Sequence, residues 1–92
     1  MESLYKIPKD VPSFCRQLRE ERGWTMLDMG NVLGSTKHYV FRVENDQYNT
    51  YLGFLRSVWE HLELSRREIL NWESLVMKEV KKRGGPKPNK EE

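Results

Sequence analysis

The sequence predicts an all-α domain of five helices, with an extended helix at its C-terminal end. Two observations indicate this fold class. Apolar residues recur at intervals of three and four in successive segments, the spacing that places them on one face of a helix. Between these segments lie glycines or polar residues that can end one helix, and serine or threonine residues that can cap the next. At 92 residues the chain suits one small domain.

Three parts are expected along the chain. Residues 1–11 form an N-terminal arm, because Pro8 and Pro12 disfavour helix there. The arm has three apolar residues, which pack on their own domain or reach a second subunit or a DNA groove. Residues 12–83 form the helical domain, including its long last helix. Residues 84–92 form a disordered basic tail, which either adds attraction to phosphates or only keeps the C-terminus soluble.

The first helix is predicted over residues 13–22, with Ser13 as its N-cap and Gly23 as its end. Its apolar face includes Phe14, Cys15 and Leu18. Cys15 is the only cysteine, so an internal disulfide is impossible, and we expect a buried structural thiol rather than a reactive or metal-binding one. Such cysteine usage suits a reducing, cytoplasmic location. The start of the chain does not indicate a secretory peptide, and no apolar run predicts a membrane span.

Residues 25–44 predict two short helices joined by a tight turn, which is the layout of a helix-turn-helix. Thr25 is expected to cap the second helix, which runs to Leu33. Gly34 allows the turn, and Gly30 lies four residues earlier, where two helices could approach closely. Ser35 or Thr36 is expected to cap the third helix, which ends near Asn45. The residues expected to face inward are Met29, Val32, Leu33, Val40 and Val43.

The last two helices are predicted over residues 50–62 and from Ser65 to Arg83. In the fourth helix a stripe at helical spacing predicts a core face, made of Leu52, Leu55, Val58, Trp59 and Leu62. Phe54 lies off that stripe and is expected to be partly exposed. In the fifth helix Ser65 and Glu68 match a capping box. Its apolar residues cover an arc of roughly 220° at about 100° per residue, more than one packed face needs.

With these elements in place, the chain resembles the Cro/phage-repressor type of helix-turn-helix, also called xenobiotic-response-element-like. The resemblance covers about residues 13–70. It rests on four motifs in the family's order and spacing: Leu18-Arg19-x-x-Arg22-Gly23-Trp24-Thr25, Met29-Gly30-x-x-Leu33-Gly34, Val40-x-Arg42-Val43-Glu44-Asn45, and Leu55-x-x-Val58-x-x-x-Leu62-x-Leu64-Ser65. The resemblance implies a five-helix fold whose third helix reads DNA. It also implies an ion pair between Arg19 and Glu44, bridging the first and third helices.

Three positions depart from the family pattern. Met26 stands where the family usually has a glutamine that holds a DNA phosphate, although backbone N–H groups at that helix end could still bind one. Ser35 replaces an apolar residue after the turn glycine. The segment after Glu44 lacks the usual glycine, but asparagine and aspartate tolerate left-handed backbone conformations.

The resemblance assigns the base-reading positions to the start and outer face of the third helix. The expected base contacts are Lys37, His38, Phe41 and Arg42. Arg42 can donate two hydrogen bonds to guanine, and Phe41 can contact a thymine methyl group. The expected phosphate contacts are Thr25, Thr36, Tyr39, Tyr48 and Asn49. The sequence indicates no metal site, no cofactor, no small-molecule ligand and no catalytic residue.

These observations favour a sequence-specific DNA-binding regulator, either a repressor or an autoregulator, which binds double-stranded DNA as a homodimer on an inverted repeat. The excess apolar surface of the fifth helix predicts the dimer interface at Trp72, Val76 and Val80. The alternative is a protein–protein adaptor on the same fold. The near-neutral body of the chain favours this alternative, as do the aromatic residues near the reading surface. An enzyme is not expected, because the sequence has no Gly-rich phosphate loop, metal-ligand cluster or nucleophile–base pair.

Overall fold

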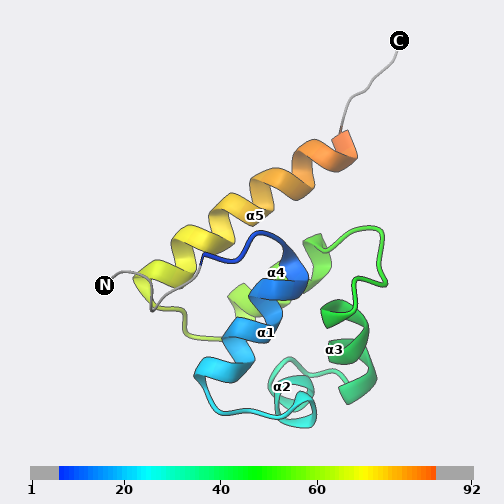
Figure 1. Ribbon diagram of the computed structural model, residues 1–92, viewed down its shortest axis with the longest axis vertical. Helices are drawn as coiled ribbons and strands as arrows, with labels where there is room; N and C mark the ends of the chain where they lie inside the picture. Colours follow the sequence, from blue (N-terminus) through cyan, green and yellow to red (C-terminus); the bar gives the residue numbers. More distant parts are fainter. Residues whose placement is uncertain (1–6, 85–92) are drawn as a thin grey trace. The chain divides into compact units, whose positions relative to one another are not determined.

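Five α-helices follow one another along residues 7–84, the part of the chain that the computed structural model describes, and no strand occurs in that range. The helices are α1 Val11–Glu21, α2 Met26–Val32, α3 Lys37–Glu44, α4 Leu52–His61 and α5 Arg66–Gly84 (Figure 1). They form two compact units, which divide between Gln47 and Tyr48. The first unit holds α1 to α3 and the second holds α4 and α5. Residues 1–6 of the predicted arm and residues 85–92 of the predicted tail lie outside the described residues.

The first helix begins two residues earlier than the sequence predicted. Asp10, and not Ser13, is the N-cap of α1, because its Oδ1 accepts a hydrogen bond from the Ser13 N–H at 2.9 Å. Pro12 lies within the first turn, where its missing N–H removes no helical hydrogen bond. The prediction of Ser13 as the cap was therefore wrong, because a carboxylate three residues earlier supplies the acceptor.

All three helices of the first unit end in the same backbone motif. In α2, Leu33 is the C-cap and Gly34 follows with φ of 70°. The Ser35 N–H donates to the Gly30 carbonyl at 2.7 Å and the Gly34 N–H to the Asn31 carbonyl at 3.1 Å, which is the Schellman pattern. The same two bonds close α1 at Gly23 and α3 at Asp46.

The core of the first unit is made by α1 and α2, each of which packs on α3. Its buried apolar residues are Val11, Phe14, Cys15, Leu18, Met29, Leu33, Val40 and Val43. Cys15 is fully buried, as the sequence predicted. Val32 is only half-buried, although it was expected to face the core.

In the second unit, α4 packs on α5. The N-cap residue of α4, Tyr51, makes no capping bond with its side chain, and the Thr50 hydroxyl accepts from the Leu52 N–H at 3.5 Å. Glu79 of α5 accepts a hydrogen bond from the Tyr51 N–H at 3.0 Å, and its carboxylate is 3.3 Å from Lys82 Nζ. At the start of α5, Ser65 and Glu68 form the predicted capping box: the Glu68 carboxylate accepts from the Ser65 N–H at 2.9 Å and the Ser65 hydroxyl from the Glu68 N–H at 3.2 Å.

Two predictions about the inner face of α4 were wrong. Phe54 is buried with 1% of its surface exposed, whereas Trp59 is 49% exposed. The reason is a rotation of the inner face. The buried residues of this segment are Tyr51, Phe54, Leu55, Val58 and Leu62. At about 100° per residue this set centres on Tyr51 and Leu62, and Trp59 falls about 80° from that centre. Trp59 therefore lies at the edge of the face.

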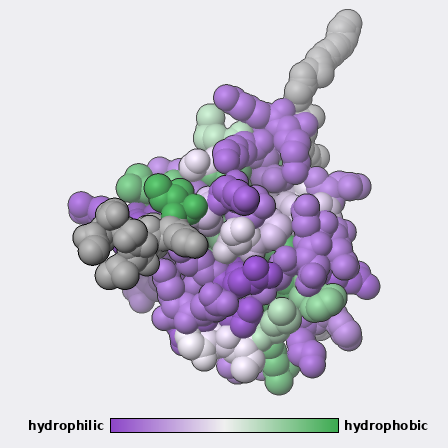
Figure 2. All heavy atoms as spheres, viewed as in Figure 1, coloured by the Kyte–Doolittle hydropathy of each residue, from purple (hydrophilic) through white to green (hydrophobic). Residues whose placement is uncertain are grey.

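Hydrophilic side chains cover most of the face drawn in Figure 2, and hydrophobic side chains gather in separate patches. Among residues 7–84, no helix is long and apolar enough to cross a lipid bilayer.

Candidate nucleic-acid interface

The exposed face of α3 brings together the four residues predicted to contact bases. The opposite face is fixed in the core by Val40 and Val43, neither of which is exposed. On the outer face, the exposed residues are Lys37, His38, Phe41 and Arg42. At about 100° per residue they span an arc of roughly 140°. The face combines two cations, an imidazole and an aromatic ring that is 45% exposed. Its chemistry can therefore serve hydrogen bonding to base edges, attraction to phosphates and apolar contact.

The start of α3 is held by Thr36, whose Oγ1 accepts a hydrogen bond from the Tyr39 N–H at 3.1 Å. Thr25 holds the start of α2 in a reciprocal capping box: its hydroxyl accepts from the Asp28 N–H at 3.1 Å, and the Asp28 carboxylate accepts from the Thr25 N–H at 3.0 Å. Both threonines are exposed, and each hydroxyl keeps its own O–H for donation. Tyr39 is half-buried.

A close approach at Gly30 fixes the distance between α2 and α3. A Cβ atom at this position would lie 2.6 Å from the Thr36 carbonyl carbon and oxygen and 3.0 Å from the Lys37 nitrogen. Real Cβ atoms essentially never come this close to backbone atoms. The absence of a side chain therefore lets the last turn of α2 lie directly against the first residues of α3, as the position of this glycine in the sequence indicated.

Glu44, at the end of α3, is a buried carboxylate that forms an ion pair with Arg19 of α1. Its side chain is 0% exposed and accepts two hydrogen bonds from Arg19, at 2.7 Å from Nε and 3.0 Å from a terminal guanidinium nitrogen. The second terminal nitrogen of Arg19 donates to the Trp24 carbonyl at 3.2 Å. The hydrogen bond to Glu44 raises the pKa of Arg19 above its ordinary value, and burial opposes this shift. The pair thus joins α1, the loop after it and the end of α3.

Two further side chains surround the Glu44 carboxylate, and sequence reasoning assigned neither to it. Arg16 Nε lies 3.5 Å from Oε1, while the Cys15 thiol donates to Oε2 at 3.7 Å. Burial, followed by the charge of Glu44, raises the pKa of the Cys15 thiol well above its usual range. The thiol therefore stays protonated and donates. The contact of Arg16 with Glu44 could have been anticipated from the sequence, because Arg16 lies one helical turn before Arg19 on α1.

The remaining predicted contacts lie in the second unit. Tyr48 is half-buried, with its ring edge-on to Tyr51 at 6.2 Å between centroids, and Asn49 is exposed. Of the predicted dimer residues, Trp72 and Val76 are half-buried and Val80 is exposed. The proposed contacts of Tyr48 and Asn49 with phosphates stay predictions.

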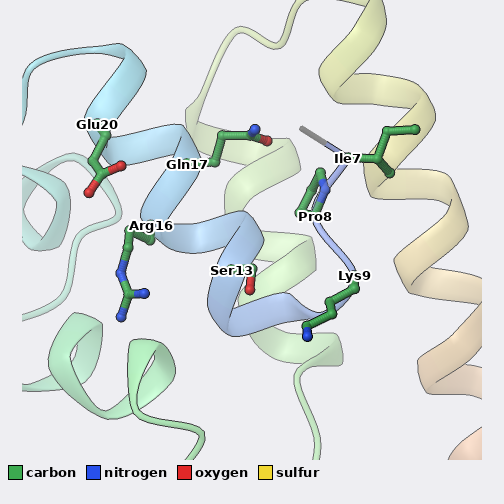
Figure 3. Close-up of a pocket in the computed structure, with 7 residues that line it drawn as sticks. All are labelled: Ile7, Pro8, Lys9, Ser13, Arg16, Gln17 and Glu20. Carbon is green, nitrogen blue, oxygen red and sulfur yellow. The ribbon is translucent and has the colours of Figure 1, made fainter. Parts of the chain in front are cut away.

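A hollow of about 530 Å³ lies beside α1. Its lining is Ile7, Pro8, Lys9, Ser13, Arg16, Gln17 and Glu20 (Figure 3). In Figure 3 the Arg16 guanidinium extends away from Ile7 and Pro8, consistent with its contact to Glu44. The lining mixes both signs of charge with amide, hydroxyl and apolar groups, so it favours no one class of ligand. Within residues 7–84 no three His, Cys, Asp or Glu side chains are grouped as metal ligands would be.

Comparison of the chain with protein-family models, with curated proteins and with solved structures found no match.

Proposed function

We propose that the chain is a sequence-specific DNA-binding regulator with a Cro/phage-repressor-like helix-turn-helix, in which α3 is the recognition helix. The main support for this proposal is that the two faces of α3 differ in burial. Val40 and Val43 anchor its inner face, while Lys37, Phe41 and Arg42 stay exposed on its outer face. A helix held in this way can enter the major groove without unfolding its own core.

Each exposed side chain has a definite task in this proposal. Arg42 donates two hydrogen bonds to O6 and N7 of a guanine, which is the commonest specific contact in the major groove. His38 donates to or accepts from a base edge, and Phe41 packs on a thymine methyl group. Lys37 binds a guanine or a phosphate. Thr36 and Tyr39 set the register of the helix through phosphate oxygens.

The second helix supports the proposal in a different way. Thr25 caps a helix end at which Met26 replaces the usual phosphate-binding glutamine. The Asp28 N–H of this first turn already donates to Thr25, so the N–H groups proposed to bind a phosphate are those of Met26 and Leu27. Such a contact positions the protein on DNA, and the α3 face supplies the specificity.

Two copies acting on an inverted repeat complete the proposal. A single recognition helix reads too few base pairs for a genome-sized search, and two-fold pairing sets two such helices one turn of DNA apart, roughly 34 Å. The chain would then act as a repressor or autoregulator, controlled by its own concentration.

Selection of bound fragments from a random duplex pool tests this function. The expected result is an enriched inverted repeat, whose half-site spacing also reports the geometry of the pairing. Arg42→Ala should weaken binding to the selected site by about 1–3 kcal/mol and relax selection at one base pair. Arg66→Ala, which removes an equal charge from the exposed start of α5, serves as the matched control. No enriched sequence, together with unchanged binding by Arg42→Ala, would refute the proposal.

A protein–protein adaptor is the second candidate. The observation that favours it is apolar exposure in the first unit, where Leu27 and Phe41 are both exposed. Aromatic and large aliphatic side chains are common anchors of protein interfaces. Salt separates the two functions, because affinity for DNA falls steeply with ionic strength. An adaptor contact through Leu27 and Phe41 would show a much weaker dependence on salt.

A further inference from the structure

An apolar groove lies on the α4–α5 unit, and none of its lining residues is among those proposed to contact DNA. Its volume is about 320 Å³. Its lining is Leu52, Leu55, Arg56, Trp59, Glu60, Trp72 and Val76. We refer to this surface as the tryptophan groove. Five of its seven residues are apolar and the other two carry opposite charges.

Two tryptophans make the wall of the tryptophan groove. Their ring centroids are 4.5 Å apart with an angle of 31° between the planes. Trp72 is fixed, because its Nε1–H donates to the Leu55 carbonyl at 2.7 Å. Trp59 leaves about half of its surface exposed. A large, pre-positioned aromatic surface of this kind is typical of the energetic centre of a protein interface.

The apolar surface continues along α5 beyond the groove. Val80 follows Val76 by four residues, so the two lie on the same side of the helix, and Val80 is exposed. The sequence predicted Trp72, Val76 and Val80 as interface residues. The structure adds Trp59 of α4 to the surface that these residues share.

The order of the two charged residues of the tryptophan groove along α4 is not the order that best stabilises the helix. Arg56 and Glu60 are both largely exposed and are separated by 3.6 Å. In α4 the cation precedes the anion, which is the weaker order for a pair four residues apart. Glu60 also lies in the last turn, where the helix dipole disfavours a negative charge. Stabilisation of α4 alone therefore gives little reason for this arrangement.

We infer that the tryptophan groove binds the same surface of a second copy of this chain, with the two α4 helices antiparallel across a two-fold axis. In such an interface every contact occurs twice, so the surface has to be self-complementary. A two-fold axis at the level of Val58 exchanges the positions of Arg56 and Glu60. Arg56 of each copy then faces Glu60 of the partner subunit, and the charges complement each other.

The same axis brings the exposed tryptophans together. Arg56 and Glu60 are roughly 6 Å apart along the helix at about 1.5 Å per residue, and Trp59 is only one residue from the level of the axis. Trp59 and its symmetry mate are therefore adjacent at the centre of the interface, while the charges form its polar rim. This pairing supplies the dimer that the proposed DNA-binding function requires, and it can be measured without DNA.

Charge-reversal variants of the full chain test the inference by sedimentation. The unsubstituted chain should be a dimer. Arg56→Glu should place like charges opposite each other twice in every homodimer, and so should Glu60→Arg. Each single variant should therefore raise the dissociation constant of the homodimer at least about tenfold. An equimolar mixture of the two single variants should form a heterodimer, because both pairs are then attractive. The double variant Arg56→Glu/Glu60→Arg should also dimerise.

Lys81→Glu is the matched control, because it reverses an exposed charge nine residues from Trp72, on the opposite side of α5. It should leave the dissociation constant unchanged.

Trp59→Ala should give a folded monomer, with folding checked by circular dichroism. Dimers that survive both single reversals would overturn the inference. A monomeric parent chain would also overturn it. Binding of the chain and of its Arg42→Ala variant to a duplex with a single half-site is measured separately. Failure of the dimer and failure of DNA binding can therefore be told apart.

Discussion

Gly30 shows how one residue can set the distance between two helices. Replacement by alanine would place a Cβ atom 2.6 Å from the Thr36 carbonyl, and backbone atoms cannot rotate away as a side chain can. We expect Gly30→Ala to reduce the free energy of unfolding by about 1–3 kcal/mol, as overpacking does. The measurement is urea denaturation followed by circular dichroism.

Gly53 provides the control, because an alanine there meets nothing within 4 Å and lies inside α4. Gly53→Ala should be neutral or should add up to about 1 kcal/mol, in line with helix propensity. If both variants were equally stable, the close approach of α2 and α3 would not limit residue 30.

A double-mutant cycle on Arg19 and Glu44 tests the buried ion pair. Arg19→Met should cost about 3 kcal/mol or more, because it leaves the buried Glu44 carboxylate without its bidentate partner. The double variant Arg19→Met/Glu44→Leu should cost less than the single one, since no buried charge then remains. Arg16 is half-exposed and can return to water. Denaturant unfolding of four proteins gives the coupling energy: the unsubstituted chain, Arg19→Met, Glu44→Leu and the double variant. Additive costs would contradict the expectation.

The residue scale also shows which contacts a sequence can predict. The Arg19–Glu44 pair was expected from a resemblance, and its geometry is now explicit in two hydrogen bonds. The contacts of Arg16 and Cys15 with the same carboxylate were not expected. They depend on how α1 is rotated above the end of α3, and periodicity alone gives the buried face but not which oxygen each side chain approaches.

At the scale of the element, α3 allows base contacts and phosphate contacts to be separated. Lys37→Ala should lower affinity for all sequences about equally and reduce the salt slope by about 1 if Lys37 binds a phosphate. Arg42→Ala should instead change which base is selected. Binding isotherms at several salt concentrations, on the selected site and on a scrambled duplex, distinguish the two. A sequence-dependent loss for Lys37→Ala would reassign it to a base edge.

The helix ends show how far local rules reach. Thr25, Gly23 and Gly34 were each predicted in the role that they occupy. Asp46 adopts φ of 56° at the end of α3, consistent with the tolerance of aspartate for this conformation. The start of α1 was missed, because Asp10 and Ser13 are both good caps and lie only three residues apart.

The α4 helix shows where periodicity becomes ambiguous. Both possible faces contain Leu55, Val58 and Leu62, so the two faces differ only in their edge residues. The burial of Tyr51 and Phe54 settles the choice and leaves Trp59 at the boundary. The misassigned edge residue, Trp59, is the centre of the proposed dimer interface.

At the scale of the whole molecule, dimerisation should appear in thermal stability. If only the folded chain pairs, the melting temperature should rise with protein concentration. Arg56→Glu should shift this dependence to at least about tenfold higher protein concentrations, while Lys81→Glu should leave it unchanged. The measurement is a series of melts over a hundredfold range of concentration. A melting temperature that is independent of concentration for the parent chain would contradict dimer formation in that range.

The whole-molecule prediction of five helices in an all-α fold is confirmed for residues 7–84. The order and approximate bounds of the helices followed from apolar spacing and caps. The contact from Glu79 to the Tyr51 N–H could not be predicted, because it joins residues 28 positions apart and carries no local pattern. Contacts of this kind need the packing of α4 on α5 to be known first.

The contact between Glu79 and the Tyr51 N–H limits how far the C-terminal end of α5 can be truncated. Leu75 is the last buried apolar residue of α5, so a shortened chain that stopped one turn later would retain every buried apolar side chain. Yet it would lack the Glu79 carboxylate that accepts from the start of α4, and also Lys82, whose Nζ lies over the Tyr51 ring at 5.9 Å. A shortened chain has to extend to Lys82 to keep both contacts. Proteolysis of α5 before Glu79 would loosen the start of α4 as well as the cut helix.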